Sequence, residues 1–471
     1  MTGLALASRV DICGRMRSVA LVEAPWRDPV QVLDAWAERP YALALLSSGG
    51  DRGRWSYLAR DPEAVLQVSA QDPRDPFEAM SQLLGERAPA AQGGPPFQGG
   101  LAGLLTYELG ARYEAAGLDR HPEWPLAACG LYLNLLAFDH RRRRVLAIGR
   151  GENELDARRR ARAALGWLDG GPPPALPDRF TDAFESLTPG EVYEASVADV
   201  TGRIAAGEIF QANISRTWGG RLSAGARPFD LVARLAGSSP APFCAYFRTP
   251  SRAVVSNSPE RFLSVDDRQG IETRPIKGTR PRGSTPAQDL ALQQELLDCE
   301  KDRAENLMIV DLMRNDISRV CPAGTVQTPE LFKLESFANV HHLVSTVTGR
   351  LAPGLGVLDA LKAAFPPGSI TGAPKVQAMK VIADYEGPRG PYCGSMFWAG
   401  FDGAGDSSVL IRTAAFIEDS GGDSGGWRFE ARAGAGIVAD SDPHLERLET
   451  EAKIDALRRA FLAPALAEQP G

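Results

Sequence analysis

Two short acidic motifs fall in segments whose pattern predicts helices, and their carboxylates are suited to metal chemistry. Asp302 and Glu305 are three residues apart, so they share one face of a helix. Glu446 and Glu449 have the same spacing in another predicted helix, and Lys453 follows one turn later on the same face. If the two helices meet, these carboxylates form an oxygen-rich site of the kind that Mg²⁺ prefers. Spacing alone fits an ordinary solvent-exposed helix face better, so the surrounding sequence has to decide.

A lysine and a glutamate in short Gly- and Pro-containing strings are candidates for covalent and acid–base chemistry. Lys277 stands in PIKGT, and Glu260 stands in SPERF directly before Arg261. Taken alone, Lys277 fits an exposed loop, and Glu260 fits a carboxylate paired with Arg261. Only a larger pattern around these two residues assigns them chemistry.

The elements that must position these residues form a mixed pattern. Helices are predicted at residues 189–206, 286–315 and 443–462, and Asp442 and Pro443 suit the start of the last one. Strands are predicted at residues 210–218, 245–248, 253–256, 261–265 and 271–274. GGDSGG at 421–426 predicts a hairpin turn. Because helices and strands do not alternate regularly, we expect an α+β fold or a complex α/β fold. The sequence has no glycine-rich phosphate-binding motif, so it gives no support for nucleotide binding.

One proline-rich segment divides the chain. Residues 168–190 contain GGPPPALP, and proline disfavours helix in the residue before it, so this segment is predicted to be a linker. It separates an N-terminal part, residues 1–167, from a larger part, residues 191–471. A second Gly/Pro-rich stretch at 88–100 is predicted to be a loop inside the first part.

Composition indicates a soluble, cytoplasmic protein. The chain of 471 residues has 44% hydrophobic residues and a net charge of −7, which argues against a general nucleic-acid binder. No stretch approaches the roughly 20 apolar residues of a membrane span. The cysteines are scattered without C-x-x-C pairs, which favours reduced thiols: Cys13, Cys129, Cys244, Cys299, Cys321 and Cys393.

A series of longer strings resembles the chorismate-utilising enzymes, a family that includes anthranilate, aminodeoxychorismate, isochorismate and salicylate synthases. The strings, in order, are SPERFL, TRPIKGTRPRG, DRAENLMIVDLMRND, HHLVSTV, PPGSITGAPKVQAM, YCGS, IRTA and AGAGIVADSDPHLERLETEAK. They extend over about residues 190–460, and LLSSGG, RWSYLA and FQGGLAGLLTYELG resemble the family in the N-terminal part. The resemblance implies a complex two-sheet α/β sandwich with helices outside.

Lys277 separates the family members. Anthranilate synthases typically have alanine at this position, whereas aminodeoxychorismate synthases have lysine. Isochorismate and salicylate synthases carry a lysine near this position but use it to activate water. The PIKGT context most resembles aminodeoxychorismate synthase, which replaces the 4-hydroxyl of chorismate with ammonia. The alternatives are anthranilate synthase component I, an isochorismate or salicylate synthase, and a catalytically silent subunit that binds tryptophan or a partner.

The resemblance implies a covalent route. Lys277 attacks ring carbon 2, and Glu260 protonates the departing 4-hydroxyl; ammonia then adds at carbon 4 and Lys277 leaves. An ordinary lysine is protonated at neutral pH, so burial or a cation such as Arg274 or Mg²⁺ must favour the free amine. Glu260 needs the opposite shift, to hold its proton.

The resemblance also implies ligands for metal and substrate. Glu305 and Glu449 are expected to bind Mg²⁺ directly, with Asp302 and Glu446 acting through water. Asp302 is shorter than the glutamate found in some members. The expected substrate-binding residues are Arg412, Lys453, His342, Thr346, Thr371, Gly368, Gly372, Gly434 and Gly436. Arg412 would hold a carboxylate, the glycines would admit backbone N–H groups, and His342 and Thr346 would face the ring.

The N-terminal part of the family helps to form a tryptophan pocket. Its positions are matched loosely by Ser47, Ser48, Trp55 and the SPAPFCAY segment with Pro240, Ala241, Pro242 and Phe243. Packing in the core or a loop explains these residues equally well. No cysteine stands in a glutamine amidotransferase motif. We therefore expect free ammonia as the direct substrate and a separate amidotransferase subunit as the partner for glutamine.

Overall fold

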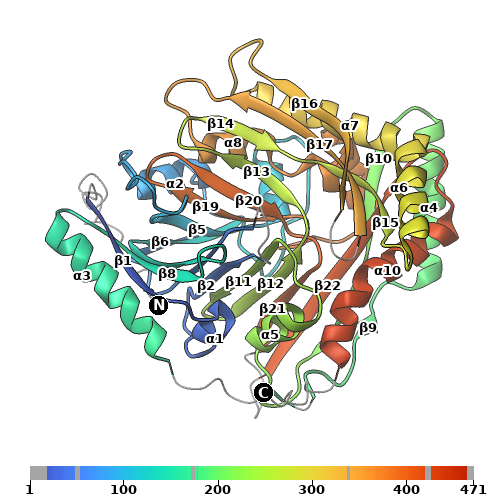
Figure 1. Cartoon of the computed structure of the whole chain (residues 1–471). Helices are drawn as coiled ribbons and strands as arrows, with labels where there is room; N and C mark the ends of the chain where they lie inside the picture. The colour runs from blue at the N-terminus through green and yellow to red at the C-terminus, as the bar shows by residue number, and fades with distance from the viewer. Residues whose placement is uncertain are drawn as a thin grey trace.

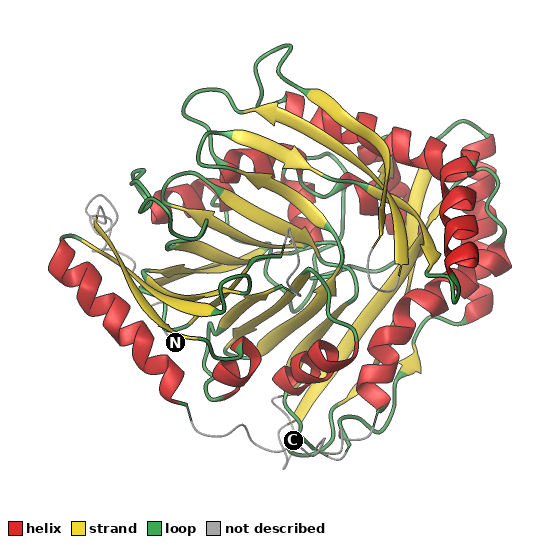
Figure 2. Cartoon of the chain, viewed as in Figure 1, coloured by secondary structure: helices red, strands yellow, loops and turns green. Residues whose placement is uncertain are grey.

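Two large β-sheets form the centre of the protein, and helices lie around them (Figures 1 and 2). The structure is a computed structural model that describes residues 18–47, 53–170, 176–177, 179–336, 340–419 and 426–463. Buried side chains of both sheets meet between them, including Leu43 and Val254 from one sheet and Leu104 and Trp398 from the other. The expected α+β, two-sheet architecture with outer helices is confirmed.

The first sheet has twelve strands. In spatial order they are β1 (Ser18–Pro25), β8 (Arg144–Gly151), β7 (Asn134–Asp139), β3 (Trp55–Ala59), β2 (Leu43–Leu46), β11 (Phe243–Thr249), β12 (Arg252–Ser258), β21 (Thr413–Asp419), β22 (Gly426–Ile437), β10 (Gln211–Arg221) and β18 (Gly372–Ala373), with β9 (Glu185–Ser186) beside β10.

The second sheet has ten strands. In spatial order they are β15 (Ile276–Pro281), β17 (Val340–Arg350), β14 (Gly270–Thr273), β13 (Arg261–Val265), β20 (Gly405–Val409), β19 (Ser395–Gly400), β5 (Gly100–Leu105), β6 (Ala127–Tyr132) and β4 (Ala64–Val68), with β16 (Gln327–Ser336) beside β17. Both sheets continue across the predicted linker, because β2 pairs with β11 and β5 pairs with β19. The residues before and after the linker therefore share the same sheets.

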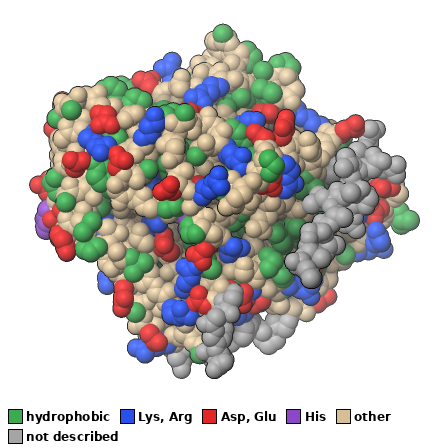
Figure 3. Space-filling model, turned by 180° about the vertical axis from the view of Figure 1, so that it is seen from behind, with side chains coloured by type: hydrophobic (Ala, Val, Ile, Leu, Met, Phe, Trp, Pro, Cys, Tyr) green, Lys and Arg blue, Asp and Glu red, His purple; other side chains and the backbone are tan. Residues whose placement is uncertain are grey.

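Helices cover the outer faces of the sheets. They are α1 (Pro29–Asp34), α2 (Pro76–Leu84), α3 (Glu154–Leu165), α4 (Gly190–Ala205), α5 (Pro228–Ser238), α6 (Pro286–Asp298), α7 (Glu300–Ser318), α8 (Val357–Ala364), α9 (Lys375–Tyr385) and α10 (Pro443–Leu462). None of these described helices is long and apolar enough to cross a membrane. Figure 3 shows positive and negative side chains intermixed on the face turned away from the view of Figure 1.

Most of the helices and strands that were predicted from local sequence signals are present, and one predicted helix is wrong. The predicted helices at 189–206 and 443–462 are α4 and α10, and Asp442 caps α10 by accepting a hydrogen bond from Leu445 N at 2.9 Å. The single helix predicted at 286–315 is wrong, because the extended residue Cys299 (φ −69°, ψ 103°) separates α6 from α7. No proline or glycine marks this break. Packing of both helices against β15 and β17 decides it.

The hairpin turn predicted at 421–426 lies almost wholly outside the described residues. Its two flanking strands, β21 and β22, pair antiparallel, and Asp419 lies opposite Gly426. The five strands predicted between 210 and 274 correspond to β10, β11, β12, β13 and β14.

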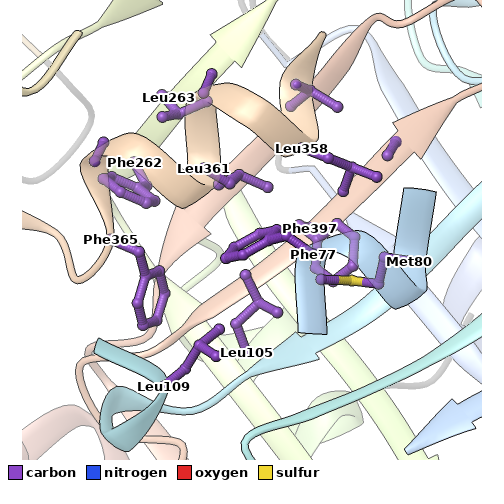
Figure 4. Packing of buried hydrophobic residues seen from close by; sticks show 14 of the residues in the cluster. Phe77, Met80, Leu105, Leu109, Phe262, Leu263, Leu358, Leu361, Phe365 and Phe397 are labelled. Atoms are coloured by element: carbon purple, nitrogen blue, oxygen red, sulfur yellow. The ribbon is translucent and has the colours of Figure 1, made fainter. Parts of the chain in front are cut away.

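Two apolar clusters attach the helices to the sheets. Figure 4 shows Phe262, Leu361 and Phe365 gathered beside Phe77 and Phe397, where α2 and α8 cover the second sheet. On the first sheet, α1, α5 and α10 supply the cover. These contacts fix α10, which carries one of the two acidic motifs.

The aromatic cluster around Phe461 provides a test of this attachment. Phe461 is fully buried, and its ring lies 4.1 Å from that of Phe429 and 6.1 Å from that of Phe416. Phe461→Ala should lower the free energy of unfolding by roughly 3–5 kcal/mol in chemical denaturation, because it leaves a cavity. Leu462→Ala is the matched control, since Leu462 is 46% exposed, and it should change stability by about 0.5 kcal/mol or less. Equal effects of the two changes would show that α10 does not depend on this cluster.

Candidate active site

Lys277 lies on β15, an outer strand of the second sheet, and its direction is set by a bulge. The register with β17 shifts between Lys277 and Thr279, and Gly278 between them has φ 78°. A side chain at position 278 would also meet Asp302 at 2.9 Å, so the close approach to α7 requires glycine. The Lys277 ammonium lies 3.8 Å from Glu305 Oε2. It therefore faces the acidic motif of α7.

Glu260 is a buried carboxyl group in the turn between β12 and β13. It is 7% exposed, and it lines a small void together with Ser369. Burial raises the pKa of Glu260, and the Ser369 hydrogen bond and the charges of Lys277 and Lys453 offset this shift only in part. A carboxyl group that keeps its proton at higher pH, facing two lysines, is suited to general acid catalysis.

The acidic motifs of α7 and α10 come together with three lysines between them. The ion pairs are Glu305–Lys277 at 3.8 Å, Glu449–Lys453 at 2.7 Å and Glu446–Lys301 at 3.9 Å. Burial raises the pKa of Glu305, the charges of Lys277 and Lys301 lower it, and the charges of Asp302 and Glu449 raise it again. The Lys301–Glu446 ion pair and the electrostatic contact between Glu305 and Glu449 place the two helices at one site.

Of the four predicted metal carboxylates, Glu305, Glu446 and Glu449 pair with lysines, and Asp302 lies near enough to Glu305 for its charge to raise the pKa of Glu305. Asp302 pairs with Arg280 at 3.3 Å, beside the backbone of Gly278. Among the described residues, no group of three or more His, Cys, Asp or Glu side chains is already arranged around a metal position. Glu305 and Glu449 still supply hard oxygen donors from two helices, and their present counter-charges are lysines. This donor set fits Mg²⁺.

Arg412 offers an uncommitted positive charge beside His342. Arg412 has φ 52°, and its guanidinium has no hydrogen bond or ion pair with any residue in the described ranges. The His342 ring is hydrogen bonded to Thr279 Oγ1 at 2.9 Å. Burial and then the Arg412 charge lower the pKa of His342 to about 4. The ring is therefore neutral near pH 7, and Arg412 is available for an anionic group.

Glycines allow β10, β22 and the 366–374 loop to pack without side chains between them. A Cβ on Gly436 would lie 3.3 Å from Lys277 Nζ, and Gly434 O accepts a hydrogen bond from Lys453 at 2.8 Å. A Cβ on Gly368 would lie 2.5 Å from Leu312 of α7. Gly372, with φ 144°, packs against the carbonyl of Gln211 on β10. Gly434 and Gly436 thus border the lysines, while Gly368 and Gly372 fix the loop.

The two predicted threonines have partners within the protein. Thr346 Oγ1 donates to Glu330 Oε2 at 3.1 Å. Thr371 is fully buried, and its hydroxyl is 3.2 Å from the carbonyl oxygens of Pro367 and Gly368.

Sequence reasoning missed several polar residues of this site. Gln211 is fully buried beside Gly436, and neither its Nε2 nor its Oε1 has a partner in the part of the chain that the structure describes. Asn213 Oδ1 is likewise unpartnered, and it lies over Gly434 near the Tyr392 hydroxyl. The signal was present: Gln211 and Asn213 are polar residues two apart in a strand-like segment, so they point to the same face. Buried amides without partners indicate a place for a ligand.

A separate cavity of about 170 Å³ lies between the sheets near β15. Ser47, Trp55 and Phe243 of the predicted tryptophan pocket line it. Pro240 is exposed and does not line it, whereas Pro242 does. Ser48 lies outside the described residues.

The two-sheet fold places a lysine, a buried carboxyl group with a raised pKa and an acidic cluster in one site, an arrangement suited to an enzyme. The family model for chorismate binding enzymes matches residues 42–459, and the chain belongs to this family. Solved structures of other proteins resemble it. Anthranilate synthase component I from Streptococcus pneumoniae gives a TM-score of 0.76 at 28% identity, over 87% of this chain and 93% of that one. The menaquinone-specific isochorismate synthase from Escherichia coli shares the fold, with a TM-score of 0.70 at 17% identity over 95% of both chains.

Curated relatives of two activities are almost equally similar. The chain is 38% identical over 467 residues to aminodeoxychorismate synthase component 1 of Klebsiella aerogenes, covering 94% of this chain and 99% of the relative. It is 36% identical over 449 residues to anthranilate synthase component 1 of Streptomyces coelicolor, covering 90% of this chain and 85% of the relative. Overall similarity therefore establishes the family without choosing between these two reactions.

The electrostatic setting of His342 can be measured directly. A histidine-selective NMR titration should show the His342 ring neutral down to about pH 4, because burial and Arg412 disfavour its charged form. Its contribution to stability is then present above pH ~6.5 and is lost as the pH falls towards about 4. Arg412→Met should raise the midpoint, with exposed His444 as the internal reference. A midpoint near 6.5 in the unmodified protein would contradict this arrangement.

Proposed function

We propose that this chain is the synthase component of an aminodeoxychorismate synthase, which converts chorismate and ammonia to 4-amino-4-deoxychorismate. The observation that carries the proposal is the position of Lys277, which faces the acidic cluster beside Gly436 and shares electrostatic contact with Glu260. A nucleophile and a proton donor within one site suit a two-step displacement. The relatives named aminodeoxychorismate synthase component 1 support this choice.

The proposed reaction assigns one role to each group. Lys277 Nζ, as the free amine, bonds to ring carbon 2, the double bond shifts, and the carbon 4–oxygen bond breaks. Glu260 donates its proton to the departing hydroxyl, which leaves as water. Ammonia then bonds to carbon 4, the double bond returns, and the bond to Lys277 breaks. The Glu260 carboxylate takes up the proton that ammonia loses.

The charges of the site are complementary to chorismate, which is a dianion. The unpaired guanidinium of Arg412 suits one carboxylate of the substrate. Glu305 and Glu449 would hold Mg²⁺, with Glu446 beside them, and the bound cation would neutralise the second carboxylate. Asp302, paired with Arg280, takes no direct part.

Ammonia would be supplied by a second protein. Of the described cysteines, Cys129, Cys244 and Cys393 are buried, and burial raises the pKa of each thiol to about 12. A thiol with a raised pKa is a poor nucleophile, so these three do not suit glutamine hydrolysis. The word "component" in the relatives' names fits a two-subunit enzyme. We therefore expect a separate glutamine amidotransferase as the partner.

A product assay tests the proposed reaction. The purified chain with chorismate, ammonium and Mg²⁺ should form 4-amino-4-deoxychorismate, identified by mass spectrometry. Lys277→Ala and Glu260→Gln should each lower kcat by about 100-fold or more, because one removes the nucleophile and the other the proton donor.

Lys362→Ala is the matched lysine control for this assay. Lys362 lies on α8, its side chain is 43% exposed, and it pairs with Asp75, so activity should be unchanged. Anthranilate as the product would replace the proposed reaction with that of the anthranilate synthase relatives. Full turnover by Lys277→Ala would refute the covalent route.

We also propose that the cavity near β15 accepts an aromatic amino acid such as tryptophan. Its walls are mainly apolar, with Phe243 and Trp398 among them, while Arg274 and Glu335 form an ion pair at one side. An aromatic ring suits the apolar wall, and the ammonium and carboxylate groups suit the charged side. Calorimetry should detect tryptophan binding that Phe243→Asp weakens by about tenfold or more, since a carboxylate would enter the apolar wall. Pro240→Ala is the control, and equal binding by both variants would place tryptophan elsewhere.

A further inference from the structure

A buried ion pair lies behind the candidate active site and outside the proposed chemistry. Lys375, the first residue of α9, places its ammonium 2.6 Å from Asp316 Oδ2 on α7 and 2.6 Å from the carbonyl oxygen of Ala364 at the end of α8. The exposed fractions of the two side chains are 5% for Lys375 and 1% for Asp316. One ammonium group therefore joins three helices inside the protein.

The pair fixes one end of the loop that connects α8 to α9. The other end is held at Gly368, where any side chain would collide with Leu312 and Met313 of α7 at 2.5–2.6 Å. Between these two points lies Ser369, which is 8% exposed and borders the same small void as Glu260. The loop thus places a hydroxyl beside the side chain of the proposed proton donor, and both of its ends rest on α7.

The contribution of this ion pair to stability does not by itself explain why it is buried here. Asp316 Oδ1 has no hydrogen-bond partner among the described residues, and burial raises the pKa of Asp316 to about 6 in spite of Lys375. Burial likewise lowers the pKa of Lys375. Apolar side chains of similar volume often stabilise a protein as well as a buried ion pair does. A charge-assisted hydrogen bond, however, fixes distance and direction more strictly than apolar packing does.

We propose that the Lys375–Asp316 pair is a positioning device that holds Ser369 against Glu260, so that the proton donor points at the departing hydroxyl. Neither residue of the pair touches the substrate. Their influence passes through the 366–374 loop, and Ser369 is the residue through which it acts. The proposal rests on Glu260 being the proton donor in the proposed function.

A cycle of variants tests this coupling, with chorismate consumption as the activity. Ser369→Ala should lower kcat about tenfold, with KM within about twofold, because Glu260 loses the group that orients it. Asp316→Leu combined with Lys375→Met removes the pair without leaving an unpaired charge, and it should lower kcat about 10- to 100-fold while the melting temperature holds. The triple variant should lose no more than about twofold beyond the double variant, since both changes break the same chain of contacts.

Two outcomes of this cycle would contradict the proposal. Unchanged kcat in the double variant, or losses that multiply in the triple variant, would show that the pair does not act through Ser369. If the double variant does not fold, Lys375→Arg carries the test: it keeps the charge but replaces a point donor with a planar fork, and it should lower kcat in the same non-additive way. Lys362→Met, which removes an exposed lysine of α8, is the control for mutation near the loop.

This design separates the inference from the proposed reaction. Following chorismate consumption measures the need for Ser369 whatever the product is. A product other than 4-amino-4-deoxychorismate, with the same non-additive losses, would overturn the proposed reaction and leave the positioning role in place. Losses of kcat that multiply in the triple variant, with 4-amino-4-deoxychorismate as the product, would overturn the positioning role and leave the proposed reaction in place.

Discussion

The mutual electrostatic contact of carboxylates and lysines at the meeting of α7, α10 and β15 is the constraint on which the rest of the structure depends. Glu305 and Glu449 are partly buried, and the charge of Glu449 raises the pKa of Glu305, so positive charge beside the two carboxylates favours their ionised forms. Lys277, Lys301 and Lys453 supply that charge here. In the proposed function, the same site receives an anionic substrate and a metal cation.

The two sheets bring segments that are far apart in the sequence, such as β15 and β22, close together at this site. Lys277 is on the second sheet, whereas Gly436 is on β22 of the first, and a Cβ at 436 would lie 2.7 Å from Gln211 Nε2 and 3.3 Å from Lys277 Nζ. The glycine at 278 serves the same end, since its φ of 78° allows the bulge that directs Lys277. The extended sheets, the bulge and the glycines are therefore parts of one geometric solution.

Burial divides the ionisable groups of the site into different roles. Desolvation raises the pKa of Glu260, which favours its protonated form, and lowers the pKa of His342, which favours its neutral form. Arg412, by contrast, keeps its charge because arginine does not deprotonate in proteins, and it has no partner within the described residues. The same low-dielectric interior thus favours a protonated carboxyl group and a neutral ring but leaves a charged guanidinium, because the three side chains differ in intrinsic acidity.

The sequence by itself determined the family, the two-sheet architecture, α4 and α10, and the identity of the residues that meet at the site. The family and the two-sheet architecture follow from the resemblance of ordered motifs to a known family, whereas α4 and α10 follow from capping by Asp442 and helical spacing, which are local. The spacing of Gln211 and Asn213 indicates a shared strand face, but only the fold shows that Gln211 is buried without a partner among the described residues. Tertiary structure alone decided the break at Cys299, the pairing of Asp302 with Arg280, and the placing of Ser369 beside Glu260. No local signal encodes these three features, because each depends on contacts with segments far along the chain or with a neighbouring element, and only the folded sheets bring those contacts together.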